Sequence, residues 1–379
     1  MNFSLNEEQM MLQDSVEKFI DNDYDFETRQ EIAASDSGFS ADVWRTFAEL
    51  GWTAVPFAED DGGFDGGAIE IMVIMQLFGR GLVVEPYLAN IVLAGGILGR
   101  AANAEQKEKW LHPIIAGELQ ATLAFVEPQS RYDIANIATV AAVDGEAWRL
   151  NGNKGFVLNG GNAGLIIVPA RSGGGQTDRD GITLFAVPAD SKGITCNAYA
   201  TVDGLRAAEI TFEDVRVDAG AVLGEVGGGF AVLDAVIDEA TLAVCAEAVG
   251  IMQVLRVKTL EYSKSRVQFG VPIGSFQVLQ HRMVDMLTDC EQSVSLLLWA
   301  TMVSASGSAE AKRAISAIKY QVGTAGQKVG QEAVQIHGGY GFIKDYPVEK
   351  FYRDVKLLTI GEGTSEIQRI VIARDLLQD

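Results

Sequence analysis

A glutamate between two glycines is the residue of this chain best suited to acid–base chemistry. Glu362 stands in Gly361-Glu362-Gly363, directly ahead of an apolar segment with helical spacing. Glycine permits backbone conformations that a Cβ forbids, so this loop could present a carboxylate beside a helix N-terminus. Ser365 and Gln368 predict a capping box that opens this last helix. By composition alone, Glu362 is equally consistent with an ordinary solvated loop.

Two other segments could bind a phosphorylated ligand. Arg266 precedes Phe269-Gly270 at the expected end of a helix, at Gly270, and could complement the helix dipole or donate a bidentate pair to a diphosphate. The cluster Gly338-Gly339-Tyr340-Gly341 could let the backbone approach a phosphate or a ring closely. Glycines also end helices, and the absence of a preceding strand excludes a Rossmann motif.

The remaining reactive residues favour no other chemistry. No serine, cysteine and histidine grouping has the spacing of a nucleophile elbow. The widely spaced Cys196, Cys245 and Cys290 predict neither a disulfide framework nor a metal site, and we expect them to be buried. Asp238 and Glu239 form an acidic pair that predicts a solvated helix face, although Glu239 is a conceivable alternative base.

Length and charge limit the possible partners. The chain has 379 residues, 48% of them hydrophobic, which predicts two or three domains. Its formal net charge of −21 disfavours nucleic acid and anionic membrane as main partners. No signal pattern and no run of 18 apolar residues is visible, so we expect a cytoplasmic protein that spans no membrane.

The hydrophobic period changes twice along the chain and predicts an α+β protein in three parts. Residues 1–117 have helical periodicity and include a long apolar stretch over 69–99. Residues 118–227 contain short apolar runs between Gly, Asn and Asp turns, which predict a β-barrel or sandwich. Residues 228–379 return to helical periodicity and predict a bundle. The expected strands are 121–126, 148–152, 155–160, 165–168, 182–187 and 209–212. The expected bundle helices are 230–264, 275–305, 308–338, 347–358 and a last one after Ser365.

These segments together resemble the acyl-CoA dehydrogenase family over essentially the whole chain. The order and spacing of the matching marks are specific, although no single one is decisive. The marks are Pro56–Gly63, Gln106–Pro113, Glu127-Pro128, Leu150–Lys154, Asn159-Gly160, Arg266–Gly270, Phe276-Gln277, Gln335–Gly341 and Glu362–Gln368. Within the family, Glu127–Asp133, Asp203–Glu209 and Cys245–Gly250 look like the small subunit of pimeloyl-CoA dehydrogenases.

The resemblance implies a helical N-terminal domain, a middle β domain, a C-terminal four-helix bundle and FAD between the last two. It implies α,β-dehydrogenation of an acyl-CoA thioester, with Glu362 as the base for the α-proton and hydride passing from Cβ to flavin N5. Electrons would pass to an electron-transfer flavoprotein, and the assembly would be a homotetramer or an α2β2 heterotetramer with a paralogous subunit.

Individual residues take their implied roles from the same resemblance. Those implied to contact FAD are Phe125, Val126, Phe156, Val157, Leu158, Arg266, Phe269, Gln277, Gln335, Gly338, Gly339, Thr364 and Glu366, of which the set from Arg266 to Gly339 reaches the FAD of a neighbouring subunit. Those implied to contact the substrate are Ser130, Asp238, Thr241 and Gly363.

Four positions depart from the family pattern. Val126 and Leu158 replace the usual threonines near the flavin, Thr241 replaces an arginine, and Gly361 replaces a tyrosine or a similar side chain. Two alternatives therefore stay open: a non-catalytic or FAD-sharing partner subunit, and a flavin oxidase on the same fold. The acyl chain is undetermined: Ala94-Gly95-Gly96 could leave room for a long or bulky chain, and Arg100 or Arg131 could pair with a dicarboxylyl substrate.

Overall fold

The computed structural model describes residues 4–358, 360–361 and 363–377, and it contains two compact units. The sheet unit comprises Glu31–Gly67 and Val84–Ala240. The helical unit comprises Met1–Gln30, Ala68–Val83 and Thr241–Asp379. The first 117 residues thus contribute to both units, and the boundaries expected at 117 and 227 stay a prediction.

The sheet unit is built on one mixed eight-stranded sheet in the order β6-β7-β3-β2-β4-β5-β8, with β1 paired to β4. β1 and β2 run parallel to β4, and the other pairs of this sheet are antiparallel. The strands are β1 (Ala121–Leu123), β2 (Val140–Asp144), β3 (Ala147–Leu158), β4 (Leu165–Arg171), β5 (Ile182–Pro188), β6 (Ile194–Ala200), β7 (Arg206–Asp218) and β8 (Val222–Leu223).

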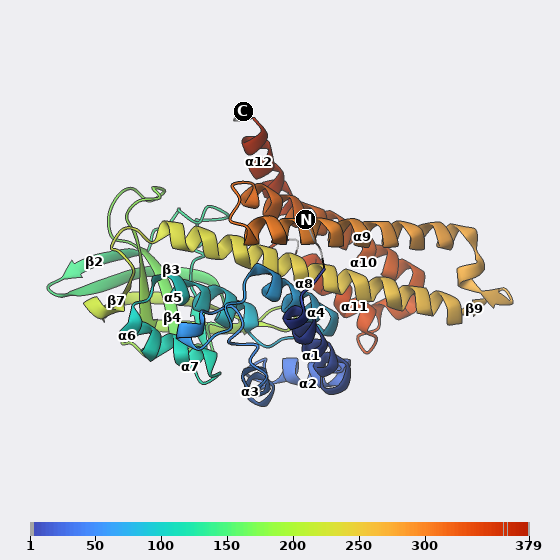
Figure 1. Cartoon of the computed structure of the whole chain (residues 1–379), viewed down its shortest axis with the longest axis horizontal. Helices are drawn as coiled ribbons and strands as arrows, with labels where there is room; N and C mark the ends of the chain where they lie inside the picture. Colours follow the sequence, from blue (N-terminus) through green and yellow to red (C-terminus); the bar gives the residue numbers. More distant parts are fainter. Residues whose placement is uncertain (1–3, 359, 362, 378–379) are drawn as a thin grey trace. The chain divides into compact units, whose positions relative to one another are not determined.

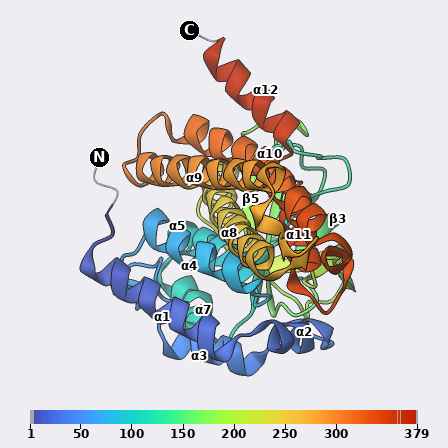
Figure 2. The same ribbon diagram turned by 90° about the vertical axis from the view of Figure 1, so that its right-hand side faces the viewer.

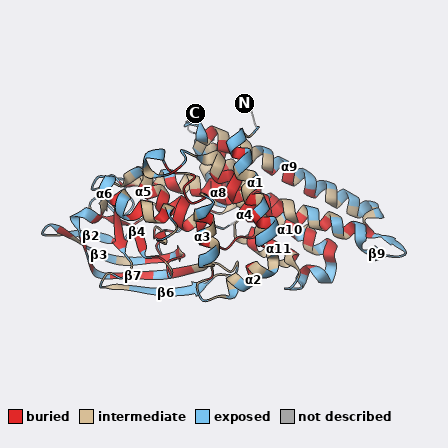
Figure 3. Cartoon of the chain, turned by 60° about the horizontal axis from the view of Figure 1, so that its bottom comes forward, coloured by how far each residue is buried: buried red, intermediate tan, exposed pale blue. Residues whose placement is uncertain are grey.

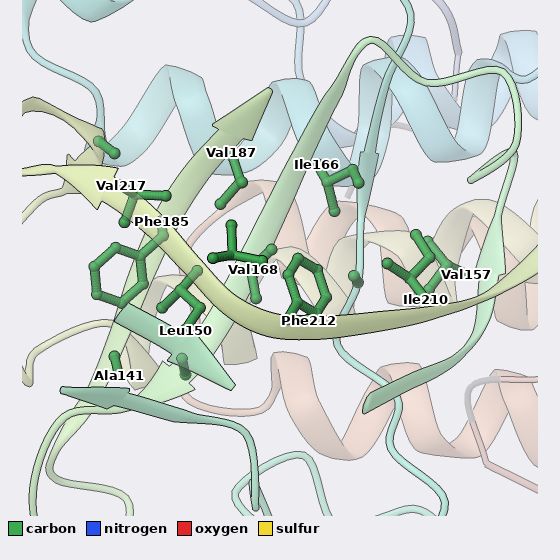
Figure 4. Close-up of a cluster of buried hydrophobic side chains, with 14 of the residues drawn as sticks. Ala141, Leu150, Val157, Ile166, Val168, Phe185, Val187, Ile210, Phe212 and Val217 are labelled. Carbon is green, nitrogen blue, oxygen red and sulfur yellow. The ribbon is translucent and has the colours of Figure 1, made fainter. Parts of the chain in front are cut away.

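Side chains from the central strands form the core of this unit. Figure 4 shows Val168 of β4, Phe185 of β5 and Phe212 of β7 directed into one apolar cluster. Each of these three side chains is at most 1% exposed, and burial of one such side chain contributes about 1.5–3 kcal/mol. Trp148 of β3 meets the edge of Phe185, with ring centroids 5.5 Å apart. The fold class expected from the sequence, with helical N- and C-terminal segments and a middle β segment, is confirmed.

Three strands of this sheet, β2, β6 and β8, have no counterpart among the expected ones, and two expected strands form a single strand. β6 is an edge strand, and six of its seven residues are exposed (Figure 3). Its alternating apolar positions are mostly small residues, which give only a weak strand signal. β2 likewise buries only Ala141. The expected strands 148–152 and 155–160 join in β3, which ends at Leu158. Its register against β7 shifts between Leu150 and Gly152 and again between Lys154 and Val157. A Cβ at Gly152 would lie 2.4 Å from Thr139 Oγ1, so glycine permits this close approach.

Long helices dominate the helical unit. Figures 1 and 2 show the long helices α9 and α10 side by side, with α12 at the end of the chain. Its helices are α1 (Glu7–Asp23), α4 (Ala68–Gly81), the greater part of α8 (Phe230–Ser265), α9 (Gln277–Ala305), α10 (Ala311–His337), η6 (Gly338–Phe342), α11 (Pro347–Leu357) and α12 (Ser365–Leu376). The bundle helices expected from the sequence are therefore confirmed to within a few residues.

The sheet unit also carries short helices. These are α3 (Ala41–Glu49), η1 (Glu59–Asp61), the π-helix η2 (Leu88–Gly95), α5 (Gly96–Ala101), α6 (Ala104–Gln106), η3 (Lys107–Leu111), α7 (His112–Ile115) and η4 (Ala219–Ala221), while α2 (Phe26–Ala34) contributes to both units. The apolar stretch 69–99 is not one helix. α4 ends at Gly81, Leu82 has a φ of 51°, and Pro86 disfavours helical geometry in the residue before it.

Side-chain hydrogen bonds close the starts of α1 and α12. At α1, Gln9 N donates to Asn6 Oδ1 over 2.8 Å, and Asn6 N donates to Gln9 Oε1 over 2.9 Å, so these two residues form a capping box. At α12 the N-cap is Thr364, whose hydroxyl accepts from Ile367 N over 3.4 Å. The capping box expected at Ser365 and Gln368 is wrong, because the helix starts one residue earlier.

Two more expectations concern burial. Cys245 and Cys290 are buried as expected, but Cys196 is exposed because it lies on the edge strand β6. Among the described helices, α8 alone is long and apolar enough to cross a membrane. In its most apolar window 72% of the residues are buried, as is usual for a core helix.

A buried histidine ends α10. His337 is 2% exposed, its Nδ1 lies 2.7 Å from the Ala333 carbonyl, and its ring stacks on Tyr262 with centroids 4.4 Å apart. Burial lowers the pKa of His337; the Ala333 bond opposes that shift, and Lys258 adds to it. The folded chain therefore favours neutral imidazole more than the unfolded chain does.

We expect the helical unit to lose stability as the pH falls through the usual histidine pKa of about 6.5 towards the lowered folded value. Below about pH 6.5 the unfolded chain binds the proton more readily, which costs about 1.4 kcal/mol for each unit of pKa difference. Urea unfolding at pH 5.5 and 7.5 measures this loss. His337→Phe keeps a ring against Tyr262 and should show a smaller pH effect, while the exposed His281→Phe should behave as wild type. Equal pH effects in the wild type and both variants would contradict the attribution of the pH effect to His337.

Candidate functional site

Two strand ends bring five of the expected flavin contacts together. Phe125 and Val126 follow β1, and Phe156 to Leu158 end β3. Gly155 N donates to the Val126 carbonyl over 2.9 Å, and Thr122 Oγ1 donates to the Leu158 carbonyl over 2.6 Å. We call Phe125, Val126, Phe156, Val157 and Leu158 the sheet cluster.

Within the sheet cluster, one aromatic ring is exposed to solvent among apolar side chains. Phe156 is 50% exposed and has a φ of 49°, whereas Val157 is 1% exposed. Val126 and Leu158 are half-buried and bring no hydroxyl group. The cluster can therefore support a planar ring by apolar contact and by main-chain hydrogen bonds.

Ser130 differs from the sheet cluster because its side chain is already engaged. It is 5% exposed, its hydroxyl accepts from Glu127 N over 3.0 Å, and it donates to Glu127 O over 2.9 Å. The Ser130 side chain thus closes a local turn with the backbone of Glu127. Its expected role beside CoA stays a prediction.

In the helical unit, the expected cofactor contacts Arg266 and Phe269 lie on the turn between α8 and α9 (Gln277–Ala305), and Gln277 begins α9. α8 ends at Ser265, and the strands β9 (Val267–Gln268) and β10 (Val271–Pro272) follow before η5 (Ile273–Ser275). The expectation of a helix up to Gly270 is therefore wrong, because the backbone turns into a hairpin. Arg266, Phe269 and Gln277 are all exposed. Phe269 is 93% exposed with a φ of 55°, which is unusual for an aromatic residue and favours contact with a partner.

The glycine cluster after α10 lies near the end of α8. Gly338 has a φ of 59°, and a Cβ built on Gly338 or Gly339 meets no atom within 4 Å, so their surface is open. Gln335, in the last turn of α10, is exposed beside them. The stack of His337 on Tyr262 joins this cluster to the helix that leads into Arg266. Arg266, Gln335, Gly338 and Gly339 are thereby brought to one end of the bundle.

The expected base, Glu362, lies outside the described residues, but both flanks of its loop contact α10. Lys319 is 1% exposed, and its ammonium donates to the Leu358 carbonyl over 2.5 Å. On the other side, the Arg369 guanidinium lies 5.9 Å from the Tyr320 ring centre. Leu358, before the loop, and Arg369, within α12 after it, thus contact adjacent residues of α10.

Gly363, Thr364 and Glu366 open α12 beside this loop. Gly363 is buried with a φ of 101°, and a Cβ there would lie 2.7 Å from Gln368 Nε2, so glycine fits best. Thr364 is the N-cap. Hydrogen bonds from its own backbone and from Thr364 lower the pKa of the exposed Glu366 carboxyl. The expected substrate and cofactor contacts in this segment are therefore grouped at one helix N-terminus.

The buried Lys319 was not singled out from the sequence. Its only sequence signal is a single cation on the apolar face of Ile315, Ile318 and Val322. A lysine ammonium stabilises a helix C-terminus because the last carbonyls have no partner within the helix. Lys319 does this for α11, at the point where the chain enters the Glu362 loop.

We expect Lys319→Met to slow acyl-CoA-dependent reduction of the bound flavin about tenfold, with a smaller change in the KM for acyl-CoA. The reason is the Leu358 carbonyl, which loses a donor at the loop entry; an unsatisfied buried acceptor costs about 1–3 kcal/mol. Stopped-flow absorbance measures the rate. Lys312→Met, at an exposed position on the same helix, is the control. An unchanged rate in a folded Lys319 variant would show that the contact does not position the loop.

The acidic pair at the start of α8 is not a simple solvated face. Glu239 forms an ion pair with Arg100, whose guanidinium also donates to the Gly96 carbonyl over 3.0 Å. Burial raises the pKa of Glu239 and Arg100 opposes that shift. Arg100 is thus already neutralised and is a poor candidate for binding a dicarboxylyl substrate. Asp238 is half-buried and Thr241 is buried on the same helix.

The small residues of η2 and α5 serve helix packing. A Cβ at Gly95 would lie 2.6 Å from the Phe57 ring, and one at Gly96 would lie 3.4 Å from Val236. Ala94 is fully buried. These residues therefore give no evidence of space for a long acyl chain.

Comparison with known proteins identifies the class to which this fold and site belong. Models of the N-terminal, middle and C-terminal domains of acyl-CoA dehydrogenases match residues 6–118, 122–215 and 227–377. The chain belongs to the acyl-CoA dehydrogenase family, whose members are oxidoreductases acting on CH–CH groups.

Three known proteins illustrate the likeness. The chain is 33% identical to the probable acyl-CoA dehydrogenase YngJ of Bacillus subtilis, with full coverage of both chains. It is 31% identical to subunit CarC of the caffeyl-CoA reductase–Etf complex of Acetobacterium woodii, covering 98% of this chain and 99% of CarC. The solved FAD complex of PigA superposes with a TM-score of 0.93 at 26% identity, over 99% of each chain.

Proposed function

We propose that this protein is an FAD-dependent dehydrogenase that introduces an α,β double bond into an acyl-CoA thioester. The observation that carries the proposal is the sheet cluster, in which segments 30 residues apart form one apolar bed with an exposed phenylalanine. Membership of the acyl-CoA dehydrogenase family and the likeness to the FAD complex of PigA support the choice of cofactor.

Each group of residues has a distinct task in this reaction. The sheet cluster holds the ring system, and the Glu362 carboxylate removes the α-proton of the thioester. A backbone N–H beside Gly363 stabilises the negative charge that develops on the thioester oxygen. FAD, when bound, accepts the hydride from the β-carbon. Thr364 and Glu366 lie at the start of α12, directly after the base.

The distance along α10 supports an assembly of several copies. Lys319, below the Glu362 loop, and Gly338, in the glycine cluster, are 19 residues apart, which corresponds to about 28 Å of helix. If the Glu362 loop and the glycine cluster at Gly338 contact the same flavin near its reacting ring, they must belong to different copies of the chain. A homotetramer meets this requirement, and an α2β2 heterotetramer with a paralogous subunit is the alternative. The likeness to CarC supports an electron-transfer flavoprotein as the electron acceptor.

The decisive experiment is anaerobic titration of the purified protein with a panel of acyl-CoA thioesters. The panel should include short, long, branched and dicarboxylyl chains, so that the acyl preference is measured in the same experiment. We expect a yellow protein whose flavin absorbance bleaches with at least one thioester and returns when an electron-transfer flavoprotein is added. A yellow protein that no acyl-CoA bleaches would refute the proposed reaction.

A second candidate function is a partner subunit that shares or stabilises a flavin site of a paralogue. Val126 and Leu158 favour it, because neither half-buried side chain can donate a hydrogen bond to a ring. This function predicts a colourless protein that acquires flavin only on co-expression with the paralogue. A flavin oxidase on the same fold instead predicts rapid reoxidation of the bleached protein by O₂, which an oxygen electrode would detect.

A further inference from the structure

A buried ion pair lies directly behind the sheet cluster. Lys154 Nζ is 2.6 Å from Glu127 Oε1, and the two side chains are 0% and 1% exposed. Glu127 is the residue after Val126, and Lys154 comes two residues before Phe156. The pair therefore joins the two strand ends that carry the sheet cluster.

Backbone groups and the Gln129 side chain form the other hydrogen bonds of the carboxylate and the ammonium. Glu127 Oε2 accepts from Ala138 N over 2.7 Å and from Thr139 N over 3.3 Å. Gln129 Nε2 also donates to Glu127 Oε2, over 2.7 Å. Lys154 Nζ makes its second contact with the Pro169 carbonyl of β4, over 2.7 Å. One ion pair thus fixes the chain after β1, the approach to β2, and the strands β3 and β4.

This arrangement favours the ionised form of Glu127. Burial alone would raise the pKa of Glu127, but Lys154 and the hydrogen-bond donors outweigh it and lower that pKa. Burial lowers the pKa of Lys154, and Glu127 opposes that shift. Since three further donors complete the carboxylate, we take the pair as ionised.

Stability alone does not explain such a pair. Replacing a buried ion pair by apolar groups of similar size is often neutral or stabilising, because desolvation of two charges is costly. An apolar pair makes no hydrogen bonds of defined geometry. The ion pair and its neighbours make five such bonds, which fix the relative position of the segments that they join.

We propose that the Glu127–Lys154 pair is a positioning device that sets the spacing between Phe125-Val126 and Phe156-Val157-Leu158. The hydrogen bond from Gly155 N to the Val126 carbonyl and the closed turn of Ser130 on Glu127 transmit this spacing to the sheet cluster. The pair acts on the flavin through these backbone segments. This inference rests on the proposed function, since it needs a flavin on the sheet cluster.

The test uses Lys154→Met, Glu127→Gln and the double variant, studied as full-length protein. We expect each single variant to raise the dissociation constant for FAD about tenfold or more, because each leaves a buried charge without its partner. The visible absorption and circular dichroism of the remaining bound flavin should also change. The double variant carries no uncompensated charge, so it should fold and unfold in urea near the wild-type midpoint without flavin, yet retain the altered flavin spectrum.

The matched control is the exposed ion pair of Arg149 with Asp144, 2.9 Å apart on the neighbouring strands β3 and β2. Arg149→Met with Asp144→Asn should leave FAD affinity and the flavin spectrum unchanged. A double Glu127/Lys154 variant with wild-type FAD affinity and spectrum would overturn the positioning role. A wild-type protein that binds no FAD would instead refute the proposed function, so the two failures are distinguishable.

Discussion

Replacement of Glu362 by glutamine is expected to reduce flavin bleaching by acyl-CoA about 10³-fold or more, at the upper range of what a positioned base contributes. Glutamine has nearly the same shape but cannot accept a proton at neutral pH. The α-proton of a thioester is weakly acidic, so reduction of the flavin should stop while FAD and acyl-CoA still bind. Rapid-mixing absorbance under nitrogen measures the rate.

The control for this variant is Glu291→Gln, an exposed carboxylate on α9. It should bleach at the wild-type rate. Binding of acyl-CoA to the Glu362 variant should be checked by the change in its flavin spectrum. Full activity in Glu362→Gln would eliminate this residue as the base. Glu239 would then need a fresh test, although its ion pair with Arg100 already makes it a poor candidate.

Arg266→Gln is the second change with a large expected effect. We expect FAD affinity to fall about 10- to 100-fold, because hydrogen bonds from a charged donor contribute about 1.5–3 kcal/mol. Arg266 is exposed on the turn after α8, so glutamine at this position should not unfold the bundle. Fluorescence titration of the FAD-free protein measures the affinity, and Lys264→Gln, an exposed cation in the same helix end, is the control.

Mixing the two impaired variants tests whether Arg266 acts on the flavin of another copy. An oligomer of Glu362→Gln and Arg266→Gln chains contains sites with the glutamate of one chain and the arginine of the other. Such sites are complete, so co-expression should restore a substantial fraction of the wild-type rate. No recovery in a confirmed mixed oligomer would mean that both residues serve the site of their own chain.

Periodicity predicted the long elements and failed where burial leaves no pattern. The bundle helices were foreseen because each has an apolar face against its neighbours. Strand β6 was not foreseen, because its apolar positions are mostly small residues with a weak preference for strands. The break after α4 was missed because Leu82 and Pro86 lie within a predominantly apolar stretch.

The sequence by itself determined the family, the three-part order of helices and strands, and the identity of the proposed base. Those properties depend on residue types and on spacing along the chain, which local patterns record. Only the tertiary structure decided that Lys154 pairs with Glu127, that Lys319 lies under the entry to the Glu362 loop, and that Arg100 is already paired with Glu239. Each of these contacts joins segments between 27 and 139 residues apart, and the partner of a buried charge depends on how the chain folds back on itself. The proposed base, Glu362, can therefore be predicted from the sequence, but the residues that would position the site around it cannot.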